Sequence, residues 1–472
     1  MYPTLDNDTI CAISTPRGVG GIAVIRISGQ DAISITDKIW QGIPLANAKS
    51  HTAHLGYIID PQEPDDEPLD QCVATLFKGP NSFTGEDVIE ISVHGSKWIQ
   101  RELINLLIRT GCRLAEPGEF TRRAFASGKL DLAQAEAVAD VIASSSKSAH
   151  RLASSQMRGA FSQHISALRD HLIKMASLLE LELDFSEEDV EFASREELTE
   201  LAMTLQEKIG KLTKSFSTGH ALKDGVPVAI VGEPNVGKST LLNQLLNDSR
   251  AIVSEIPGTT RDTIEDTIEI DNVLYRFIDT AGIRETDDTV ENMGIQRTLA
   301  AVTKARIIIW MITPDASISA IRTIAGDISK HIPSDSQLII AVNKIDRFGE
   351  DFSREELSEA VLSLFPAPTP LLYVSAFDGT GMDTLLSTLH EYSGADEASE
   401  ADIMVTNARH YEALVHAGDS LQRVLQGIAA GISGDFIAQD LRETIHHLGT
   451  ITGTITTTDL LHSIFKNFCI GK

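Results

Sequence analysis

The stretch 228–239 limits the possible folds of this chain more than any other, because a short apolar run leads directly into a glycine-rich loop. The run 228–231 has the composition of a buried parallel strand, and leucines recur at helical spacing after the loop. Between them lies the pattern G-x-x-x-x-G-K-S, which ends in Lys238 and Ser239. In such a strand–loop–helix unit the backbone N–H groups bind phosphate oxygens, the lysine reaches the β- and γ-phosphates, and the serine hydroxyl holds Mg²⁺. The stretch therefore predicts a nucleoside triphosphate site, and a glycine-rich turn without a ligand is the alternative.

Two later strand-to-loop junctions carry polar groups suited to a purine base. Residues 343–346 read Asn-Lys-Ile-Asp after one apolar run, and residues 375–376 read Ser-Ala after the next. Guanine presents N1–H and N2–H₂ donors, so the carboxylate of Asp346 can accept two hydrogen bonds from guanine and would lose both against adenine. Asn343 can bridge the base edge to the phosphate loop, and the N–H of Ala376 can meet guanine O6. This ordered set predicts selectivity for GTP.

Two loops between the phosphate loop and these junctions have the composition of nucleotide-sensing segments. The loop 257–262 contains Thr260, which can complete the Mg²⁺ shell and sense the γ-phosphate. The segment 277–282 ends a strand at Asp279, which can hold Mg²⁺ through water, and its last residue, a glycine, can give an N–H to the γ-phosphate.

One residue expected in a Ras-like switch is missing. Ile283 stands where such switches place a glutamine that orients the attacking water. Water must therefore be positioned by another group, or hydrolysis must wait for a trigger. Glu291 is a candidate for organising the water, although a surface carboxylate is an equally simple interpretation. Asn235 and the segment 254–260 are placed to hold a monovalent cation near the β/γ bridge.

The predicted nucleotide site draws on five stretches of the chain. Its candidate GTP-binding residues are Asn235, Val236, Gly237, Lys238, Ser239, Thr240, Ser254, Glu255, Ile256, Pro257, Gly258, Thr259, Thr260, Asp279, Thr280, Ala281, Gly282, Asn343, Lys344, Asp346, Ser375, Ala376 and Phe377.

Composition narrows the class of protein. The formal net charge of −27 argues against a broad surface that coats nucleic acid. The four cysteines lie far apart in the sequence, which suggests reduced thiols in a cytoplasmic protein rather than a disulfide framework. No apolar run is long enough to cross a bilayer, so no membrane association is expected.

The 472 residues suggest several domains. Strand and helix patterns alternate after the phosphate loop, which predicts a mostly parallel sheet covered on both faces. Helical periodicity flanks that region on both sides, whereas the start of the chain mixes strands and helices. We therefore expect a multidomain fold with a mixed α/β N-terminal domain at 1–125, a discontinuous all-α helical domain at 126–222 and 393–472, and an inserted α/β P-loop GTPase domain at 223–392.

The chain resembles the tRNA modification GTPase family called MnmE or TrmE from end to end. The resemblance is carried by motifs outside the nucleotide domain, which separate this family from ribosome-assembly GTPases that share only the core. These motifs are Asp-Thr-Ile at 8–10, Gly-Gly-Ile at 20–22, Arg-Ile-Ser-Gly at 26–29, Asn-Ser-Phe-Thr-Gly-Glu-Asp at 81–87, Pro-Gly-Glu-Phe-Thr at 117–121, Asp-Leu-Ala-Gln-Ala-Glu-Ala at 131–137 and Phe-Cys-Ile-Gly-Lys at 468–472.

The resemblance implies a specific activity. Members of the family bind 5-formyl- or methylene-tetrahydrofolate through an N-terminal domain that also forms the homodimer. With a FAD-dependent partner, MnmG (GidA), they form a heterotetramer that adds an aminomethyl or carboxymethylaminomethyl group at C5 of the wobble uridine of certain tRNAs. Their G domains pair in a manner that depends on K⁺ and GTP, and this pairing activates hydrolysis.

Carried onto this sequence, the resemblance implies roles for individual residues. Folate contacts fall on Arg26, Glu90 and Lys129, with the terminal Lys472 nearby; without the resemblance, the first two would be charged residues on an exposed strand face. Glu291 matches the catalytic carboxylate of the family. The implied metal ligands are Ser239 and Thr260 for Mg²⁺, and Asn235, Ser254, Ile256 and Thr259 for K⁺.

Three alternatives stay open on the sequence. The chain could be a ribosome-assembly GTPase that binds ribosomal RNA, although its acidity and the lack of a basic C-terminal module count against this. It could also be a folate-binding protein whose G domain is only a scaffold. Cys469 is either a nucleophile or an inert, partly buried thiol, and we favour the inert thiol because no base lies near it in the sequence.

Overall fold

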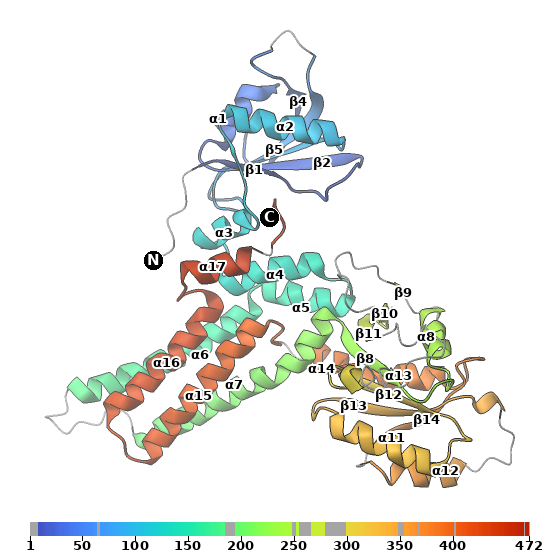
Figure 1. Cartoon of the computed structure of the whole chain (residues 1–472). Helices are drawn as coiled ribbons and strands as arrows, with labels where there is room; N and C mark the ends of the chain where they lie inside the picture. Colours follow the sequence, from blue (N-terminus) through green and yellow to red (C-terminus); the bar gives the residue numbers. More distant parts are fainter. Residues whose placement is uncertain are drawn as a thin grey trace. The chain divides into compact units, whose positions relative to one another are not determined.

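The computed structural model describes residues 8–63, 67–184, 194–247, 252–253, 266–278, 299–347, 354–365, 369–400, 403–466 and 468–471 (Figure 1). The contacts divide the chain into two compact units, each built around a seven-stranded sheet. The first unit contains Met1–Ile142, Gln156–Ala193 and Ile432–Lys472, and the second contains Ala143–Ser155 and Ser194–Gly431. The predicted combination of a mixed α/β region, a discontinuous set of long helices and an inserted α/β P-loop domain is confirmed.

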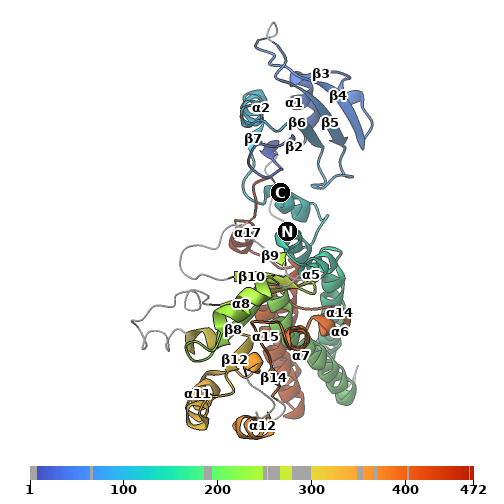
Figure 2. The same cartoon turned by 90° about the vertical axis from the view of Figure 1, so that its right-hand side faces the viewer.

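The sheet of the first unit has the strand order β3-β4-β5-β6-β2-β1-β7. These strands are β1 (Ile10–Ile13), β2 (Ile22–Ser28), β3 (Trp40–Gln41), β4 (Thr52–Ile58), β5 (Asp70–Phe77), β6 (Val88–His94) and β7 (Arg113–Leu114). The β1–β7 pair is parallel, and the other described pairs are antiparallel. Helices α1 (Ala32–Ile39) and α2 (Lys97–Thr110) pack on one face, and Figure 2 shows α2 along that side.

Alternation along the strands explains why α1 and α2 cover only one face of this sheet. On β2, Ile25 and Ile27 are fully buried under the two helices, whereas Val24 and Arg26, which alternate with them, are only partly buried. Because successive strand residues point to opposite faces, Val24 and Arg26 share the other, more open face, which Phe120 approaches beside Arg26. That open face carries the Arg26–Glu90 pair.

The remaining helices of the first unit include one pair of long, closely packed helices and a cluster of three shorter helices. They are α3 (Glu119–Ala126), α4 (Leu132–Ala143), α6 (Ala160–Asp184), α16 (Gly434–Thr452) and α17 (Thr458–Phe465). Helix α6 packs along α16, and Phe125 of α3 shares a small core with Leu132, Leu461 and Phe465. The C-terminal helices thus belong to the same compact unit as the N-terminal sheet.

The sheet of the second unit has the strand order β14-β13-β12-β8-β11-β10-β9. These strands are β8 (Val226–Val231), β9 (Ile252–Val253), β10 (Asp266–Ile270), β11 (Val273–Phe277), β12 (Ile307–Ile312), β13 (Gln337–Val342) and β14 (Leu371–Tyr373). Pairing is parallel from β14 to β11 and antiparallel at β10 and β9. The mostly parallel sheet predicted from the alternating pattern is therefore present.

Helices cover both faces of this second sheet, as predicted. Helices α8 (Lys238–Asn247) and α13 (Met382–Ser393) share one core with alternate strand residues such as Ile309. Helices α11 (Ile318–His331) and α12 (Arg354–Leu362) share the other core with Ile308 and Trp310. Burial on both sides is why these strands read as continuous apolar runs in the sequence.

The second unit also contains α7 (Arg195–Asp224), α14 (Ala395–Glu400), α15 (Ala408–Ala429) and the short 3₁₀ turn η3 (Ile345–Arg347). Helix α5 (Lys147–Met157) belongs to this unit as far as Ser155. Helix α7 packs along α15 and passes into β8 through Gly225, whose φ of 94° ends the helix. Among the described residues, no helix is sufficiently long and apolar to span a membrane.

Candidate functional site

The loop between β8 and α8 has the backbone that a phosphate cradle requires. Gly232 and Gly237 have φ values of 150° and 104°, a region that favours glycine. A Cβ at Gly232 would overlap the carbonyl oxygen of Met311, and one at Gly237 would overlap Nδ2 of Asn343. Asn235 also has a positive φ, of 63°. These positions turn the loop tightly around the N-terminus of α8, where the backbone N–H groups and the helix dipole favour an anion.

The ammonium group of Lys238 lies over this loop. Its Nζ donates hydrogen bonds to the carbonyl oxygens of Gly232, at 2.7 Å, and Glu233, at 2.9 Å. Burial lowers the pKa of Lys238, and the nearby carboxylate of Glu233 opposes that shift. The lysine is therefore held as a donor above the loop, where phosphate oxygens can replace the two carbonyls as acceptors.

Asn343 joins the phosphate loop to the loop that follows β14. Its Nδ2 donates to the carbonyl oxygen of Val236, at 2.8 Å, and its Oδ1 accepts from the N–H of Ala376, at 2.9 Å. Asn343 and Ala376 are each 2% exposed, so both bonds lie inside the protein. The side-chain amide of Asn343 thereby links three of the five predicted stretches through two hydrogen bonds.

The carboxylate of Asp346, which is predicted to read the base, is held by its neighbour. Ser375 Oγ donates to Asp346 Oδ1 at 2.8 Å, and Asp346 itself is exposed on η3. Lys344, with a φ of 66°, bonds through Nζ to the carbonyl oxygen of Asn235. Phe377 follows directly and is 83% exposed. The structure thus brings together the predicted residues of 235–240, 343–346 and 375–377.

Ser239 and Thr240 lie in the first turn of α8, with Ser239 partly buried and Thr240 exposed. The other predicted nucleotide and metal positions fall outside the described residues. They are Ser254, Glu255, Ile256, Pro257, Gly258, Thr259, Thr260, Asp279, Thr280, Ala281, Gly282 and Glu291, and the same holds for Lys472 of the predicted folate site.

The predicted folate residues Arg26 and Glu90 are direct neighbours on the open face of the first sheet. They stand opposite each other in the β2–β6 register, and Nε and Nη2 of Arg26 contact Glu90 Oε1 at 2.9 and 2.7 Å. The guanidinium carbon lies 5.4 Å from the ring centroid of Phe83 and 5.7 Å from that of Phe120. Phe83 is 37% exposed, so an aromatic surface borders this ion pair.

The third predicted folate residue, Lys129, lies near the loop that carries Phe83. A Cβ at Gly85 would lie 3.7 Å from Cε of Lys129 and 2.9 Å from Oγ of Ser127. Ser127 Oγ also donates to the carbonyl oxygen of Thr84 at 2.7 Å. The loop 81–87 therefore lies between the Arg26–Glu90 pair and Lys129, and it brings all three described residues to one region.

A buried ionic network holds this loop in place, and sequence reasoning did not identify it as part of the site. Arg123 is 1% exposed and bonds to Glu86 at 3.0 Å, Asp8 at 2.9 Å and Glu119 at 3.1 Å. Burial works to raise the pKa of Glu119, but hydrogen bonds, led by that from Arg113, outweigh it and lower the pKa. The family motif at 81–87 contains Glu86, so this motif was the sequence signal that could have indicated the network.

The C-terminal segment contacts the same region of the first unit. Ser14 Oγ donates to the carbonyl oxygen of Gly471 at 3.0 Å, and Ile470 forms a bridge with Pro117. Cys469 accepts a backbone bond from Gly118 at 3.3 Å, and its side chain is exposed. The expectation of a partly buried thiol at Cys469 is therefore wrong as to burial, because this side chain is exposed.

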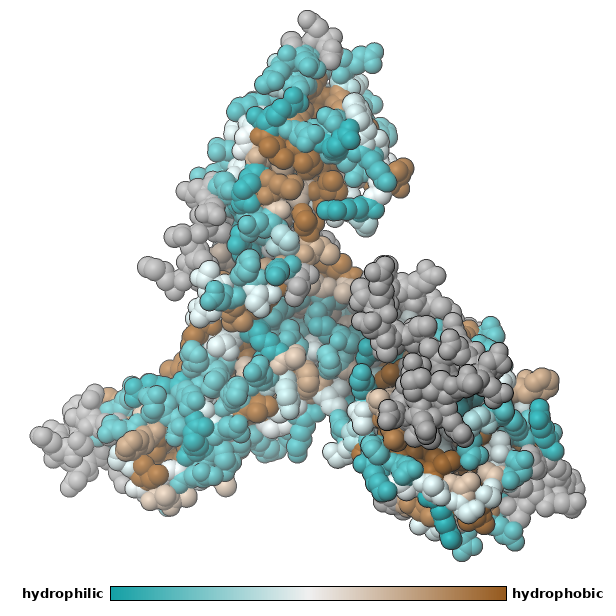
Figure 3. Space-filling view, in the orientation of Figure 1, coloured by the Kyte–Doolittle hydropathy of each residue, from teal (hydrophilic) through white to brown (hydrophobic). Residues whose placement is uncertain are grey.

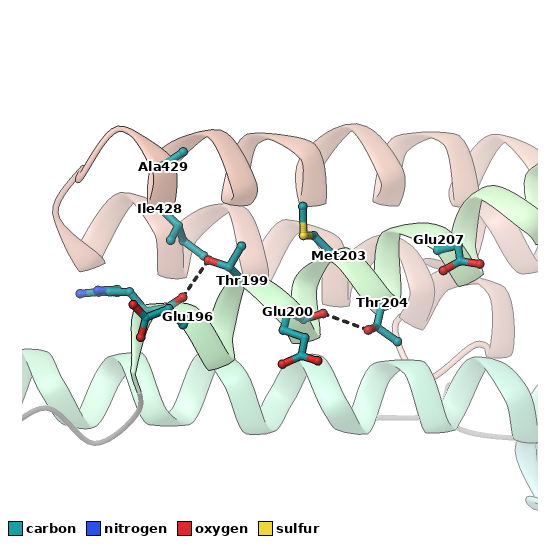
Figure 4. A pocket seen from close by; sticks show the side chains of 9 residues that line it. Glu196, Thr199, Glu200, Met203, Thr204, Glu207, Ile428 and Ala429 are labelled. Atoms are coloured by element: carbon teal, nitrogen blue, oxygen red, sulfur yellow. Dashed lines mark hydrogen bonds between the residues drawn. The ribbon is translucent and has the colours of Figure 1, made fainter.

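A shallow groove lies elsewhere on the second unit, between α7 and α15 (Figure 4). Its volume is about 590 Å³, and its lining residues are Arg195, Glu196, Thr199, Glu200, Met203, Thr204, Glu207, Ile428 and Ala429. Three carboxylates make this groove unsuitable for a phosphate, and none of the predicted site residues lines it. We therefore place neither nucleotide nor folate there.

The geometry of the second unit defines a class of protein. A phosphate loop after β8, a sheet with helices on both faces and an asparagine that links the loop to the segment after β14 together make a P-loop GTP-binding domain. The chain around this domain decides which GTPase family it represents.

Comparison with known proteins identifies the family. Residues 9–129 match the model described as the GTP-binding protein TrmE N-terminus, and residues 132–469 match that of the MnmE helical domain. A relative from Bacteroides thetaiotaomicron, named tRNA modification GTPase MnmE, is 49% identical over 475 residues, covering 99% of this chain and 100% of the relative. A relative of the same name from Parabacteroides distasonis is also 49% identical, over 472 residues, covering 98% and 100%. The chain belongs to the MnmE family of tRNA modification GTPases, and it is a GTPase.

Proposed function

We propose that this GTPase, with a FAD-dependent partner of the MnmG type, modifies C5 of the wobble uridine of certain tRNAs with a one-carbon unit from a tetrahydrofolate. The added group is aminomethyl or carboxymethylaminomethyl. The observation that carries the proposal is the coexistence, in one chain, of a pre-assembled GTP site and an aromatic-bordered Arg26–Glu90 pair. We place the activity in the cytoplasm, where tRNA is found and where the four free cysteines would remain thiols.

The nucleotide site supports binding of GTP in one orientation. Asp346 accepts the N1–H and N2–H₂ donors of guanine, with its other contact made by Ser375. The loop and Lys238 then receive the phosphates at the N-terminus of α8. Phe377, exposed beside Ala376, borders the base.

The hydroxyl oxygens available here fit a Mg²⁺ ion, which prefers oxygen ligands. Ser239, in the first turn of α8, and Thr260 would hold it, and Asn235, Ser254, Ile256 and Thr259 would supply oxygens for K⁺. Such cations neutralise charge that develops on the transferring phosphate. Glu291 would orient the attacking water, since Ile283 cannot.

The first unit supports binding of a tetrahydrofolate. The pterin ring presents an N–H beside an exocyclic amine, which is the donor pattern that a carboxylate such as Glu90 accepts. Arg26 holds that carboxylate from the neighbouring strand, and the exposed ring of Phe83 offers a surface for stacking. Lys129, and Lys472 at the chain end, would pair with the carboxylates of the folate tail.

The open face of the first sheet supports a homodimer. Leu55 on β4 and Val73 on β5 stand opposite each other on this face and are 66% and 36% exposed, and Ile22 on β2 is 69% exposed. In the space-filling view, hydrophobic surface on this domain is visible among hydrophilic residues (Figure 3). Apolar patches of this kind mark interaction surfaces, so we assign the face to self-association.

Nucleoside analysis of tRNA tests the proposal directly. A strain lacking this gene should lose the modified wobble nucleoside, and the wild-type gene should restore it. Glu90→Gln should fail to restore the nucleoside while the purified variant still hydrolyses GTP, because the two sites are separate. An unchanged nucleoside profile in the deletion strain would rule the proposal out.

A further inference from the structure

The outer surface of α2 carries an exposed tryptophan among basic side chains. Of the three tryptophans in the chain, Trp40 and Trp310 are buried, whereas Trp98 is 55% exposed. Lys97 and Arg101 are also exposed, on the side of α2 that faces away from the sheet (Figure 2). Residues three or four positions apart are neighbours on a helix surface, so Arg101 lies beside both Lys97 and Trp98.

The loop before β2 adds a third basic residue to this surface. The carbonyl oxygen of Gly18 accepts a hydrogen bond of 3.3 Å from Nε2 of Gln100 on α2, and the N–H of Gly20 donates to the carbonyl oxygen of Gly95 at 3.2 Å. These bonds hold the loop against the start of α2. Arg17, which directly precedes Gly18, is exposed. We define the α2 patch as Arg17, Lys97, Trp98 and Arg101.

The acidic groups next to the α2 patch leave it with an excess of positive charge. Oε1 of Glu102 accepts from Nε of Arg101 at 3.0 Å, and such an exposed pair contributes little, so a phosphate can compete with this carboxylate. The carboxylate of Asp70 is paired with His94, at 2.7 Å. Among the described residues around the start of α2, the basic side chains therefore outnumber the acidic ones, although the whole chain has a formal charge of −27.

The stability of the helix does not account for these residues. Lys97 is the first residue of α2, whose first turn contains no acidic residue, and a cation in that position opposes the helix dipole. Trp98 leaves more than half of its surface in water, so it adds little to the core. Both residues are thus better explained by a ligand than by folding.

We propose that the α2 patch is a binding surface for tRNA. Its three basic side chains contact phosphates of a single-stranded loop, and one unpaired base of that loop stacks on Trp98. The inference rests on the proposed function, in which tRNA is the substrate, and it adds where the tRNA lies on this chain. The Debye length is about 8 Å at physiological ionic strength, so acidic groups elsewhere on the chain are largely screened from phosphates held here. A homodimer formed through the other, more open face of the sheet does not use this surface.

The fluorescence of Trp98 tests the stacking contact directly, because the other two tryptophans are buried. Bulk deacylated tRNA added to the full chain at low salt should quench the intrinsic fluorescence and shield it from iodide. In Trp98→Phe this quenching should disappear, whereas the affinity for tRNA should stay within about threefold of wild type, since a phenylalanine ring also stacks on a base. Full access of iodide to Trp98 at saturating tRNA would overturn the proposal.

Binding measurements on variants separate the two contributions. Trp98→Ala should weaken binding of tRNA about five- to a hundredfold, the range for losing one stacked base. Lys97→Gln and Arg101→Gln should each lower the slope of log affinity against log salt by about 0.7–0.9, because each removes one contact with a phosphate. All three side chains are exposed, so the fold should be kept.

Two matched controls lie outside the α2 patch. Phe436 on α16 is also an exposed aromatic residue, and Arg109 lies at the far end of α2, where it pairs with Asp60 at 2.7 Å. Phe436→Ala and Arg109→Gln should bind tRNA within about twofold of wild type. If Trp98→Ala bound tRNA as tightly as Phe436→Ala, the α2 patch would be refuted as the binding surface.

Nucleoside analysis separates failure of this inference from failure of the proposed function. A deletion strain that keeps the modified wobble nucleoside would refute the proposed function. If the wild-type gene restores the nucleoside, a gene that carries Trp98→Ala with Lys97→Gln should restore less of it, while the purified double variant hydrolyses GTP as wild type does. Full restoration by this gene would refute only the α2 patch. Poor restoration with unchanged affinity for tRNA would also overturn it, because the surface would then serve a protein partner.

Discussion

Replacing Asn343 by alanine is the sharpest test of the nucleotide site, because this amide satisfies two buried backbone groups at once. The carbonyl of Val236 would lose a donor at 2.8 Å, and the N–H of Ala376 would lose an acceptor at 2.9 Å. Each buried group left without a partner costs about 1–3 kcal/mol. Since the alanine leaves space that water can enter, we take the lower half of that range, about 2–4 kcal/mol for the pair.

This free energy should appear mainly as lost nucleotide affinity. A bound nucleotide needs the phosphate loop and the loop after β14 in one arrangement, whereas the empty loops can relax. At 1.4 kcal/mol for each factor of ten, the expected loss is about 30- to 700-fold in the affinity for GDP. Fluorescence titration with a labelled GDP measures it, and circular dichroism checks that the fold is kept.

Lys344→Ala supplies the matched comparison. Lys344 also contacts the phosphate loop, through the carbonyl oxygen of Asn235, but that bond is exposed. Water can replace it, so the loss should stay below about tenfold. If Asn343→Ala bound GDP within threefold of wild type, the reasoning from buried backbone partners would be refuted.

Three other substitutions have clear expected outcomes. Asp346→Asn should weaken GTP binding and admit xanthosine triphosphate, because the amide offers a donor where guanine also presents one; unchanged selectivity in a competition assay would contradict this. Glu291→Ala should keep GTP affinity and lower turnover, and an equal loss in both would make Glu291 a binding residue. Glu119→Gln should reduce the loss of stability in acid. Burial works to raise the pKa of Glu119, but hydrogen bonds led by that from Arg113 outweigh it and hold the pKa below its ordinary 4.5 in the folded protein. Its contribution to stability is therefore present above pH 4.5 and is lost as the pH falls through the lowered value. Thermal unfolding followed from pH 6 to pH 3 should show a shallower decline in the variant than in wild type.

The nucleotide site was predictable because its information is local. The spacing of glycines between a strand and a helix specifies where the phosphate loop lies. Polar residues directly after apolar runs specify which side chains stand at the edge of the parallel sheet. The alternation of Ile308 and Ile309 between two cores explains why the strand was readable as a continuous apolar run. The bridge from Asn343 to the phosphate loop was predicted, but its second bond, to the N–H of Ala376, was not, because that bond depends on how the loop after β14 packs against β13.

The folate region was less predictable because its contacts join distant parts of the chain. Arg123 bonds to Asp8, 115 residues away, and to Glu86, 37 residues away. Ser14 meets Gly471 across 457 residues. No periodicity or spacing encodes such pairs, because they follow from strand order and from the return of the C-terminal helices to the first unit. Only the resemblance to a family indicated that Arg26 and Glu90 belong together.

The two proposed sites use one recognition chemistry, which gives a final prediction. Guanine and the pterin of a tetrahydrofolate both present a ring N–H beside a 2-amino group, and each site offers a carboxylate that a neighbour holds by one oxygen. Ser375 holds Asp346, and Arg26 holds Glu90. Removing the 2-amino group should therefore weaken the binding of both ligands, by about 0.5–1.5 kcal/mol or more for each hydrogen bond lost. Inosine triphosphate should bind less tightly than GTP, and a 2-deamino tetrahydrofolate less tightly than the parent compound. Asp346→Asn should change only the nucleotide preference, and Glu90→Gln should change only the folate preference. Calorimetry on both variants measures the affinity for each ligand. If either variant also changed the preference for the other ligand, the assignment of two separate carboxylates would be contradicted.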